Sequence, residues 1–281
     1  MHTSELTPTG FGSRVNGRPD RHTAPNLTDL LHRHGVLLLP GLAPTPGEFV
    51  EFARQFGEPE HVFPEAHQVA GHAVLRLQSN VDGLGASAGG RYWHADGAFA
   101  ERPTAVTALL CVEAPASGGD TLFADMRAAL ASLPDEVRAQ AAGHRGYYPA
   151  KEIARRDMER ARMMRTVVMT DEEQAAKLAE LQNVHHPLVR RHPVTGKQAL
   201  YLNEHWLARV EGLTDADSER LLATLYEAAT RESHVYRHTW TEGDVLVWDN
   251  ALVMHKALPA ANGTRKVTYR CTIADGSAPP G

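Results

Sequence analysis

Hydrophobic residues recur at helical spacing in two segments near the start of the chain. Residues 26–35 and 46–57 each contain an apolar stripe, formed by Leu27, Leu30 and Leu31 in the first segment and by Phe49, Phe52, Ala53 and Phe56 in the second. We expect the first helix to be capped by Asn26 and to end at Gly35. Residues 36–41, which lie between these helices, are mostly apolar and predict a buried strand.

The rest of the chain alternates between strand-like and helix-like segments. β-Branched and apolar runs predict strands at residues 72–80, 104–115, 118–126, 234–240, 243–250 and 265–276, and a hairpin over 186–203 that turns at Thr195 and Gly196. Composition predicts helices over 126–143 and 215–233. Strands at both ends of the chain favour two sheets built from distant segments. We therefore predict an α/β fold with a mostly β core, a double-stranded β-helix (jelly-roll, cupin-like) with helical insertions.

The chain is expected to form a single domain over residues 26–281, because no obvious linker interrupts it, preceded by a loose N-terminal arm over residues 1–25. Residues 144–183 differ from their surroundings by their high charge, and five arginines lie close together in them, namely Arg155, Arg156, Arg160, Arg162 and Arg165. One interpretation is a solvated helical insert. The other is a mobile lid that helps to hold an anionic substrate.

Composition narrows the class of protein. The 281 residues are 42% hydrophobic and 22% charged, which is ordinary for a globular protein, and no apolar run is long enough to span a membrane. The net charge of −5 argues against nucleic-acid binding, which requires a basic surface. The two cysteines are too few for a disulfide framework, and no secretory signal is evident, so we expect a cytoplasmic protein. The arm and the insert are where contacts of a homo-oligomer would be expected.

The stretch "GRYWHADGAF" contains a candidate metal-binding pair. His94 and Asp96 are two residues apart, and on a strand such side chains project from the same face. About two His-x-acid triplets are expected by chance in a chain with 16 His and 34 acidic residues, so the spacing alone decides nothing. The residues around the pair must therefore decide whether His94 and Asp96 bind a metal.

His255 is the best candidate for a third ligand, because it follows the predicted strand that ends at Trp248 and Asp249. Two histidines and one carboxylate form the facial triad of non-haem Fe(II) oxygenases, which leaves coordination positions for a cosubstrate and O₂. Other histidine groups compete for this role, namely His32 with His34 and His185 with His186. The first pair falls on a short helix, and the second precedes a proline with no carboxylate nearby.

Four blocks of the sequence together resemble a known family. They are "WHADGAFAERPTAVTALLCVEAPASGGDTLFADMRAALASLP", "HPLVRRHPVTGKQALYLN", "VYRHTWTEGDVLVWDNALVMHKA" and "RKVTYRCTIADG". In this order they resemble the taurine dioxygenase and 2,4-dichlorophenoxyacetate dioxygenase (TauD/TfdA) family of Fe(II)/2-oxoglutarate-dependent oxygenases. The resemblance covers roughly residues 26 to 275. It implies His94, Asp96 and His255 as iron ligands and Thr121 as a hydroxyl donor to 2-oxoglutarate. Asp96 argues against a halogenase, which carries a small residue there.

The last strand departs from the family pattern of two arginines four residues apart. Four residues before Arg270 the chain has Lys266, with Arg265 next to it and on the opposite face. Three arrangements stay open: Lys266 supplies the charge that holds 2-oxoglutarate, a bulge turns Arg265 inward, or Arg270 itself takes the cosubstrate. The substitution matters because only a guanidinium offers a planar fork to a carboxylate. The candidates for substrate binding are Tyr92, Arg265 and Arg270.

The implied reaction consumes Fe(II)-bound 2-oxoglutarate and O₂, releases succinate and CO₂, and oxidises a C–H bond of a small molecule. Hydroxylation is the default outcome, and desaturation, cyclisation and epimerisation are alternatives. The basic residues favour a substrate that carries a carboxylate, sulfonate, sulfate or phosphonate. Two interpretations from other classes also remain, a metal-dependent jelly-roll hydrolase and an inactive binding scaffold.

Overall fold

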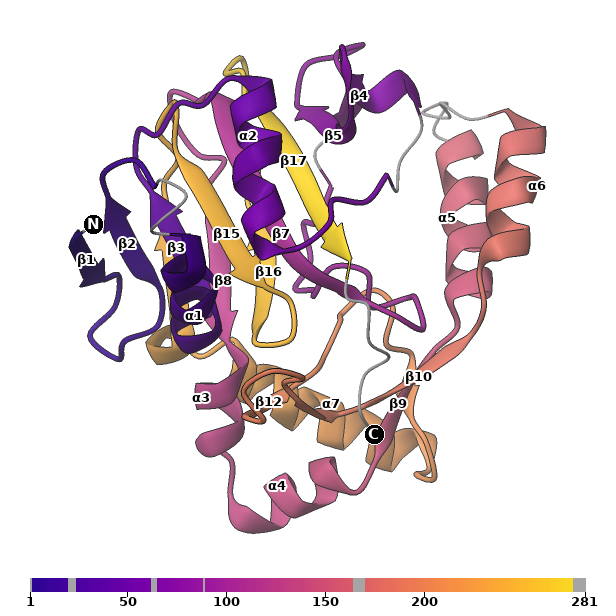
Figure 1. Cartoon of the computed structure of the whole chain (residues 1–281). Coiled ribbons are helices and arrows are strands. Elements are labelled where there is room, and N and C mark those ends of the chain that lie inside the picture. The colour runs from indigo at the N-terminus through magenta and orange to yellow at the C-terminus, as the bar shows by residue number, and fades with distance from the viewer. Residues whose placement is uncertain (1, 20–23, 62–64, 88, 164–169, 275–281) are drawn as a thin grey trace.

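The computed structural model describes residues 2–19, 24–61, 65–87, 89–163 and 170–274 (Figure 1). Its largest element is a nine-stranded sheet with the order β1-β2-β3-β15-β7-β17-β5-β4, in which β6 also pairs with β5. The strands are β1 (His2–Glu5), β2 (Ser13–Asn16), β3 (Val36–Leu39), β4 (Gln68–Val69), β5 (His72–Ser79), β6 (Ala86–Ser87), β7 (Thr104–Glu113), β15 (Val245–Asp249) and β17 (Val267–Ala274). Strands from both ends of the chain thus share one sheet, as the sequence predicts.

A second sheet of three strands, β14-β8-β16, packs against the large sheet. It consists of β8 (Thr121–Asp125), β14 (Val235–His238) and β16 (Val253–Ala257). The fully buried ring of Phe123 on β8 lies 5.5 Å from the ring of Trp248 on β15. One hydrophobic core therefore fills the space between the two sheets.

Two helices cover the other face of the large sheet and form a second core with it. They are α1 (Ala24–His34) and α2 (Pro46–Ala53), and a 3₁₀ turn over Arg54–Phe56 extends α2. A capping box formed by Thr45 and Glu48 begins α2, and Pro46 occupies its first position. The expectation that Asn26 caps α1 is wrong, because the helix begins two residues earlier, at Ala24.

Most of the other helices and strands lie toward the lower and right-hand edges of Figure 1. They are α3 (Met126–Ala131), α4 (Asp135–Ala142), β9 (Arg145–Tyr148), α5 (Ala150–Met163), α6 (Asp171–Glu180), β10 (Val184–Pro187), β11 (Val189–Arg191), β12 (Gln198–Leu200), β13 (Arg209–Val210) and α7 (Asp215–Ala229). The predicted hairpin is the antiparallel pair β11–β12. The single helix expected over 126–143 is divided into α3 and α4, because Pro134 has no N–H to continue a helix and instead stands at the N-cap of α4.

The N-terminal segment differs from the loose arm expected from the sequence. Strands β1 and β2 pair with each other, and β2 pairs in parallel with β3, so that residues 2–16 extend the large sheet. The reason is the alternation in β2, where Ser13 and Val15 are buried while Arg14 is exposed. The apolar side of this strand would be left in water if the arm were free.

The charged segment 144–183 contains helices α5 and α6, flanked by β9 and β10, strands that the sequence pattern did not predict. Arg155, Arg156 and Arg160 are exposed on α5, and Arg162 pairs with Asp171 at the start of α6. Arg165 lies outside the described residues. The arginines that are described follow the solvated-face interpretation.

Across the described part of the chain, no helix is both long enough and apolar enough to cross a membrane. Cys111 and Cys271 are buried free thiols, as expected from their apolar strands.

Packing of Phe123 between the sheets generates a stability prediction. We expect Phe123→Ala to lower the free energy of unfolding by about 3–5 kcal/mol, because it removes a buried aromatic ring and leaves a cavity. Val194→Ala is the control, since Val194 is 70% exposed, and its effect should stay within about 0.5 kcal/mol. Urea unfolding followed by circular dichroism measures both, and a loss below about 1 kcal/mol for Phe123→Ala would contradict the packing described.

Candidate metal centre and its cavity

His94 and His255 are brought together by backbone pairing between distant segments. The N–H of His94 donates to the carbonyl of His255 at 2.9 Å, and the N–H of His255 donates to the carbonyl of His94 at 2.8 Å. His255 lies in β16, which pairs on its other side with β8. The centres of the two imidazole rings therefore lie 4.1 Å apart. The sequence placed His255 beyond the end of β15, and the structure shows that it belongs to the next strand.

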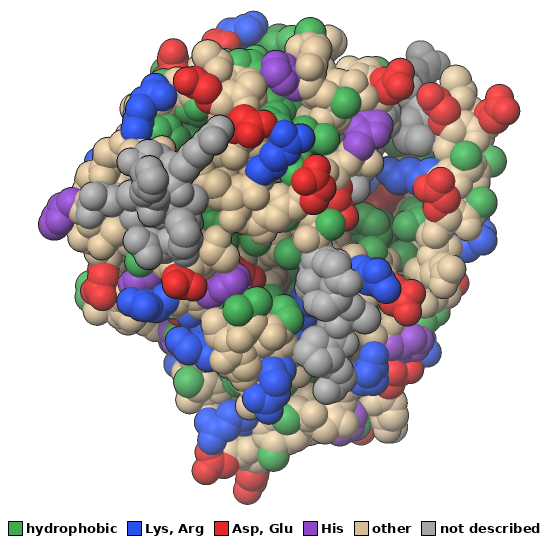
Figure 2. Space-filling model, in the orientation of Figure 1, with side chains coloured by type: hydrophobic (Ala, Val, Ile, Leu, Met, Phe, Trp, Pro, Cys, Tyr) green, Lys and Arg blue, Asp and Glu red, His purple; other side chains and the backbone are tan. Residues whose placement is uncertain are grey.

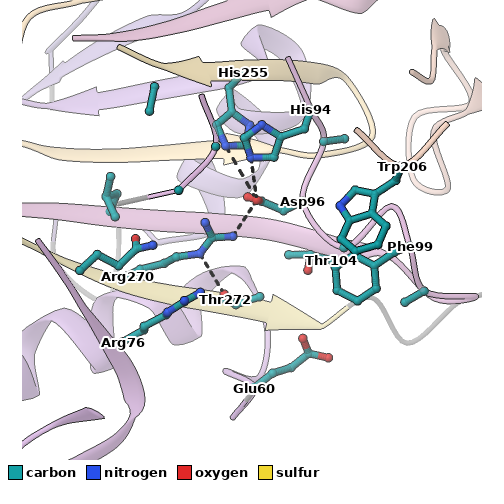
Figure 3. Close-up of a pocket in the computed structure, with 18 of the residues that line it drawn as sticks. Glu60, Arg76, His94, Asp96, Phe99, Thr104, Trp206, His255, Arg270 and Thr272 are labelled. Atoms are coloured by element: carbon teal, nitrogen blue, oxygen red, sulfur yellow. Dashed lines mark hydrogen bonds and ion pairs between the residues drawn. The ribbon is translucent and has the colours of Figure 1, made fainter. Parts of the chain in front are cut away.

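Asp96 faces both histidines from the same loop as His94 (Figure 3). Its Oδ1 lies 3.6 Å from Nε2 of His94 and 3.8 Å from Nε2 of His255. Its Oδ2 accepts a hydrogen bond from the Thr107 hydroxyl at 2.8 Å, and its backbone N–H donates to Oδ1 of Asn250 at 3.1 Å. The carboxylate is thus held in one orientation, with Oδ1 toward the rings.

The three side chains fit a metal ion by distance. The separations of 3.6 and 3.8 Å are too long for hydrogen bonds. They suit donors that each lie about 2.0–2.2 Å from one ion. Nδ1 of His94 bonds to the carbonyl of Tyr92 at 2.8 Å, so this nitrogen carries the proton and Nε2 presents its lone pair to the site.

Protonation also suits metal binding. Burial lowers the pKa of both His94 and His255, which keeps the rings neutral and able to ligate near pH 7. Burial would raise the pKa of Asp96, but the charge of Arg270 and its hydrogen bond to the carboxylate outweigh this and hold that pKa below its ordinary value. The site therefore offers two neutral imidazoles and one carboxylate, the facial triad of non-haem Fe(II) enzymes.

A second group of possible ligands among the described residues comprises His32, His192 and Asp249. Here Nδ1 of His192 accepts hydrogen bonds from the backbone N–H groups of Val194 and Thr195, at 3.1 and 3.0 Å. Nε2 of His192 consequently carries the proton and donates to Asp249 at 2.8 Å. Both ring nitrogens are in use, so this group fastens the β11–β12 turn to the end of β15.

The other histidines considered from the sequence lie elsewhere. Nδ1 of His185 pairs with Glu211 at 2.9 Å, and Nε2 of His186 bonds to the carbonyl of Ala100 at 3.0 Å. His34 bonds through Nδ1 to the carbonyl of Gly10. None of these three histidines belongs to the triad.

A cavity of about 980 Å³ lies beside the triad and is lined by strands of both sheets and by α6. The surface of the molecule is hollowed next to α5 and α6 (Figure 2). The residues that line the cavity include the triad, the predicted residues Tyr92, Thr121, Lys266 and Arg270, and several that sequence reasoning did not single out, namely Glu60, Arg76, Gln78, Phe99, Lys177 and Trp206. The three ligand side chains therefore face a space large enough for a small substrate.

Thr121 and Lys266 lie together at the part of the cavity formed near β8. The Thr121 hydroxyl accepts a hydrogen bond from Nε1 of Trp240 at 2.9 Å, and the Lys266 ammonium lies 5.0 Å from the centre of the Trp240 ring. The ammonium donates to the carbonyl of Gly119 at 2.5 Å. Burial lowers the pKa of Lys266 to about 8. This amine is charged at pH 7 and forms no ion pair in the described part of the chain, although the charge of Asp120 also acts on it.

Arg270 and Arg265 point in different directions. Arg270 donates to Oδ1 of Asp96 at 2.8 Å and faces the cavity together with Thr268 and Thr272, which follow the same two-residue spacing. Arg265 is exposed and pairs with Glu113 at 2.8 Å. A register shift does occur at Val267, but it leaves Lys266 rather than Arg265 in the cavity wall. The structure therefore does not bring Arg265 to the site.

Tyr92 connects the triad to the charged segment. Its ring stacks on the ring of His205, with the two ring centres 4.7 Å apart. Nε2 of His205 forms a hydrogen bond with Oδ2 of Asp157 on α5 at 2.6 Å. Burial raises the pKa of Tyr92 to about 12, so the phenol stays neutral. Phe99 and Trp206, with ring centres 5.0 Å apart, add an apolar wall on this side of the cavity (Figure 3).

Arg76 is the main cavity residue that sequence reasoning missed. It lies on β5 directly opposite Arg270 on β17. The signal was present in "HAVLRLQSN", where Arg76 and Gln78 share one face and the apolar Leu75 and Leu77 share the other. Alternation alone does not reveal whether the polar face meets water or a cavity.

Comparison with known proteins agrees with this geometry. A family model described as "Taurine catabolism dioxygenase TauD, TfdA family" matches residues 2–272. The alpha-ketoglutarate-dependent 2,4-dichlorophenoxyacetate dioxygenase of Cupriavidus pinatubonensis is 33% identical over 88% of this chain and 86% of its own length. The alpha-ketoglutarate-dependent sulfate ester dioxygenase of Pseudomonas putida is 31% identical over 96% of this chain and 86% of its own.

Solved structures give the same result. A taurine dioxygenase from Burkholderia xenovorans superposes with a TM-score of 0.77 at 28% identity, covering 96% of this chain and 88% of that one. AAD-2, solved in complex with Mn(II) and N-oxalylglycine, gives 0.77 at 26% identity over 99% and 98% of the two chains. The family match, which spans nearly the whole chain, agrees with the cofactors expected from the sequence, Fe(II) and 2-oxoglutarate with O₂. The chain belongs to the TauD/TfdA family and is a 2-oxoglutarate-dependent dioxygenase, an oxidoreductase.

Proposed function

We propose that this enzyme hydroxylates an unactivated C–H bond of a small, anionic organic molecule, with release of succinate and CO₂. The observation that carries the proposal is the two-histidine, one-carboxylate triad facing a cavity whose wall places Arg76, Lys266 and Arg270 around it. Curated relatives support the anionic substrate, since they include dioxygenases of 2,4-dichlorophenoxyacetate and of sulfate esters. The two packed sheets fit the double-stranded β-helix expected from the sequence.

Nε2 of His94, Oδ1 of Asp96 and Nε2 of His255 would hold the iron. When bound, iron with 2-oxoglutarate and O₂ supplies an oxidant strong enough to attack an unactivated C–H bond. The protein contributes orientation: the Tyr92 carbonyl fixes the His94 tautomer, and Thr107 fixes the carboxylate. Asp96 and His255 are buried and His94 is partly buried, which would limit the access of water to the reacting groups.

Lys266 and Thr121 would hold the distal carboxylate of 2-oxoglutarate. The buried ammonium supplies the charge that a desolvated carboxylate requires, and the Thr121 hydroxyl adds a hydrogen bond. Arg270 lies instead against Asp96, close to the triad, and we assign it together with Tyr92 to the substrate.

Other outcomes of the same chemistry remain alternatives. Desaturation, cyclisation and epimerisation begin from the same attack on a C–H bond and differ in how the substrate is placed. One relative, 31% identical over 96% of this chain and 92% of its own length, is the pentalenolactone F synthase of Streptomyces arenae. A hydrolytic metal site and an inactive scaffold are the more distant alternatives, and succinate release separates both from an oxygenase.

The metal assignment predicts the effect of removing one ligand. Anaerobic addition of Fe(II) and 2-oxoglutarate should give a weak visible charge-transfer band, and admission of air should release succinate. His255→Ala should lose the band and at least about 100-fold of succinate formation while keeping the fold, because two ligands hold the ion poorly. His185→Ala, a half-exposed histidine outside the triad, is the matched control and should behave as the wild type. Full turnover by His255→Ala would overturn the assignment.

The Lys266 assignment predicts a pH dependence. The ammonium is charged below its pKa of about 8 and becomes neutral as pH rises through that value, so the KM for 2-oxoglutarate should rise about tenfold for each further pH unit. Cys111, whose pKa burial raises to about 12, stays neutral across this range. Lys266→Arg should remove the dependence, because a guanidinium stays charged. Initial rates of succinate release between pH 7 and 10 measure this, and a flat wild-type KM would contradict it.

A further inference from the structure

Two guanidinium groups face the cavity side by side. Arg76 on β5 and Arg270 on β17 are register partners in an antiparallel pair, so their side chains leave the sheet on the same face. Figure 3 shows Arg76 next to Arg270, with Asp96 on the far side of Arg270. Like charges placed directly opposite each other destabilise a sheet. Such a pair therefore requires an anion nearby.

The protein itself supplies little negative charge to this pair. Arg270 takes the one inward-facing oxygen of Asp96, and Nε of Arg76 is buried with no hydrogen-bond partner in the described part of the chain. Burial and the charge of Arg270 lower the pKa of Arg76 to about 10. Lys177 on α6 also lines the cavity, and burial together with the charge of Arg76 lowers its pKa. Three cations thus repel one another in a partly desolvated space.

Apart from Asp96, the carboxylates in the cavity wall form no ion pair with Arg76 or Arg270 among the described residues. Glu60 is partly buried, and its carboxylate forms no ion pair with Arg76 or Arg270 among the described residues; Figure 3 shows it directed away from Arg76. Glu173 and Glu180 lie on α6 with Lys177, and Glu180 acts on Lys177 rather than on Arg76. The excess of positive charge is therefore concentrated at Arg76 and Arg270.

The remaining charge can be counted on the basis of the proposed function, on which this inference rests. Fe(II), the Asp96 carboxylate and 2-oxoglutarate together carry one net negative charge, and the Lys266 ammonium neutralises it. With Lys177 set against Glu180 and Asp96 serving the metal, Arg76 and Arg270 are left with two positive charges and no further carboxylate partner in the described part of the chain. A monoanionic group would leave one buried guanidinium uncompensated, which is costly.

We infer that Arg76 and Arg270 form a subsite for a dianionic group, a phosphate monoester or a phosphonate, and that Arg76 selects it over a monoanion such as a sulfate ester. Two guanidinium forks present parallel N–H donors that match the several oxygens of a tetrahedral phosphorus group. The aromatic wall of Phe99 and Trp206 lies across the cavity from Arg76 and would take the apolar body of the same molecule (Figure 3).

Phenyl phosphate and phenyl sulfate form a matched pair of probes, because they share shape and differ in charge at pH 7.5, above the second pKa of about 6 typical of a phosphate ester. Calorimetric titration into the anaerobic protein loaded with Fe(II) and 2-oxoglutarate measures binding without turnover. We expect phenyl phosphate to bind at least about tenfold more tightly than phenyl sulfate. Arg76→Gln should weaken phenyl phosphate about tenfold or more and leave phenyl sulfate within about threefold.

Arg265→Gln is the matched control, because Arg265 is an arginine near the same strand that points away from the cavity. It should leave both affinities unchanged. Equal affinities of the wild type for the two probes, or no binding of either, would overturn the inference. The inference would also be overturned if Arg76→Gln lowered the affinity for 2-oxoglutarate, measured through the charge-transfer band, and left the affinity for phenyl phosphate unchanged. Absence of the band in the wild type would overturn the proposed function itself, so the two failures are distinguishable.

Discussion

The buried carboxylate of Asp96 is the group on which the site depends. A carboxylate removed from water is costly unless its oxygens are paired, and here Thr107 pairs one oxygen while Arg270 and the two histidines surround the other. The same contacts fix the direction of Oδ1 and keep the group ionised. The arrangement that makes the buried charge tolerable is thus the arrangement that prepares it as a metal ligand.

The triad could be predicted from the sequence because its members follow simple rules. His94 and Asp96 lie two residues apart, although in a loop rather than on the strand expected, and the surrounding blocks indicate the family. Just before β17, the same two-residue spacing distinguishes Lys266, which lines the cavity, from Arg265, which pairs with Glu113 at the surface. Local periodicity is therefore informative wherever the identity of the buried face is already known.

Arg76 and the N-terminal strands could not be predicted for a physical reason. A polar residue in an alternating strand faces either water or a cavity, and only the packing of the second sheet and α6 decides which. The strand β2 is short, and its pairing with β3 depends on a contact that local sequence does not specify. For the charged segment the sequence left a solvated insert and a lid open, and among its described residues the cation that lines the cavity is Lys177, while Arg155, Arg156 and Arg160 face solvent.

The position of β17 has a consequence for biosynthesis. This strand lies between β7 and β5, and β15 lies between β3 and β7, so the middle of the large sheet is made from residues translated long after their neighbours. Until the ribosome has delivered residues 245–274, strands β3, β5 and β7 present unpaired edges, which are open to aggregation. His255 arrives in the same interval. The third residue of the triad is therefore made only when the strands that complete the large sheet are being made.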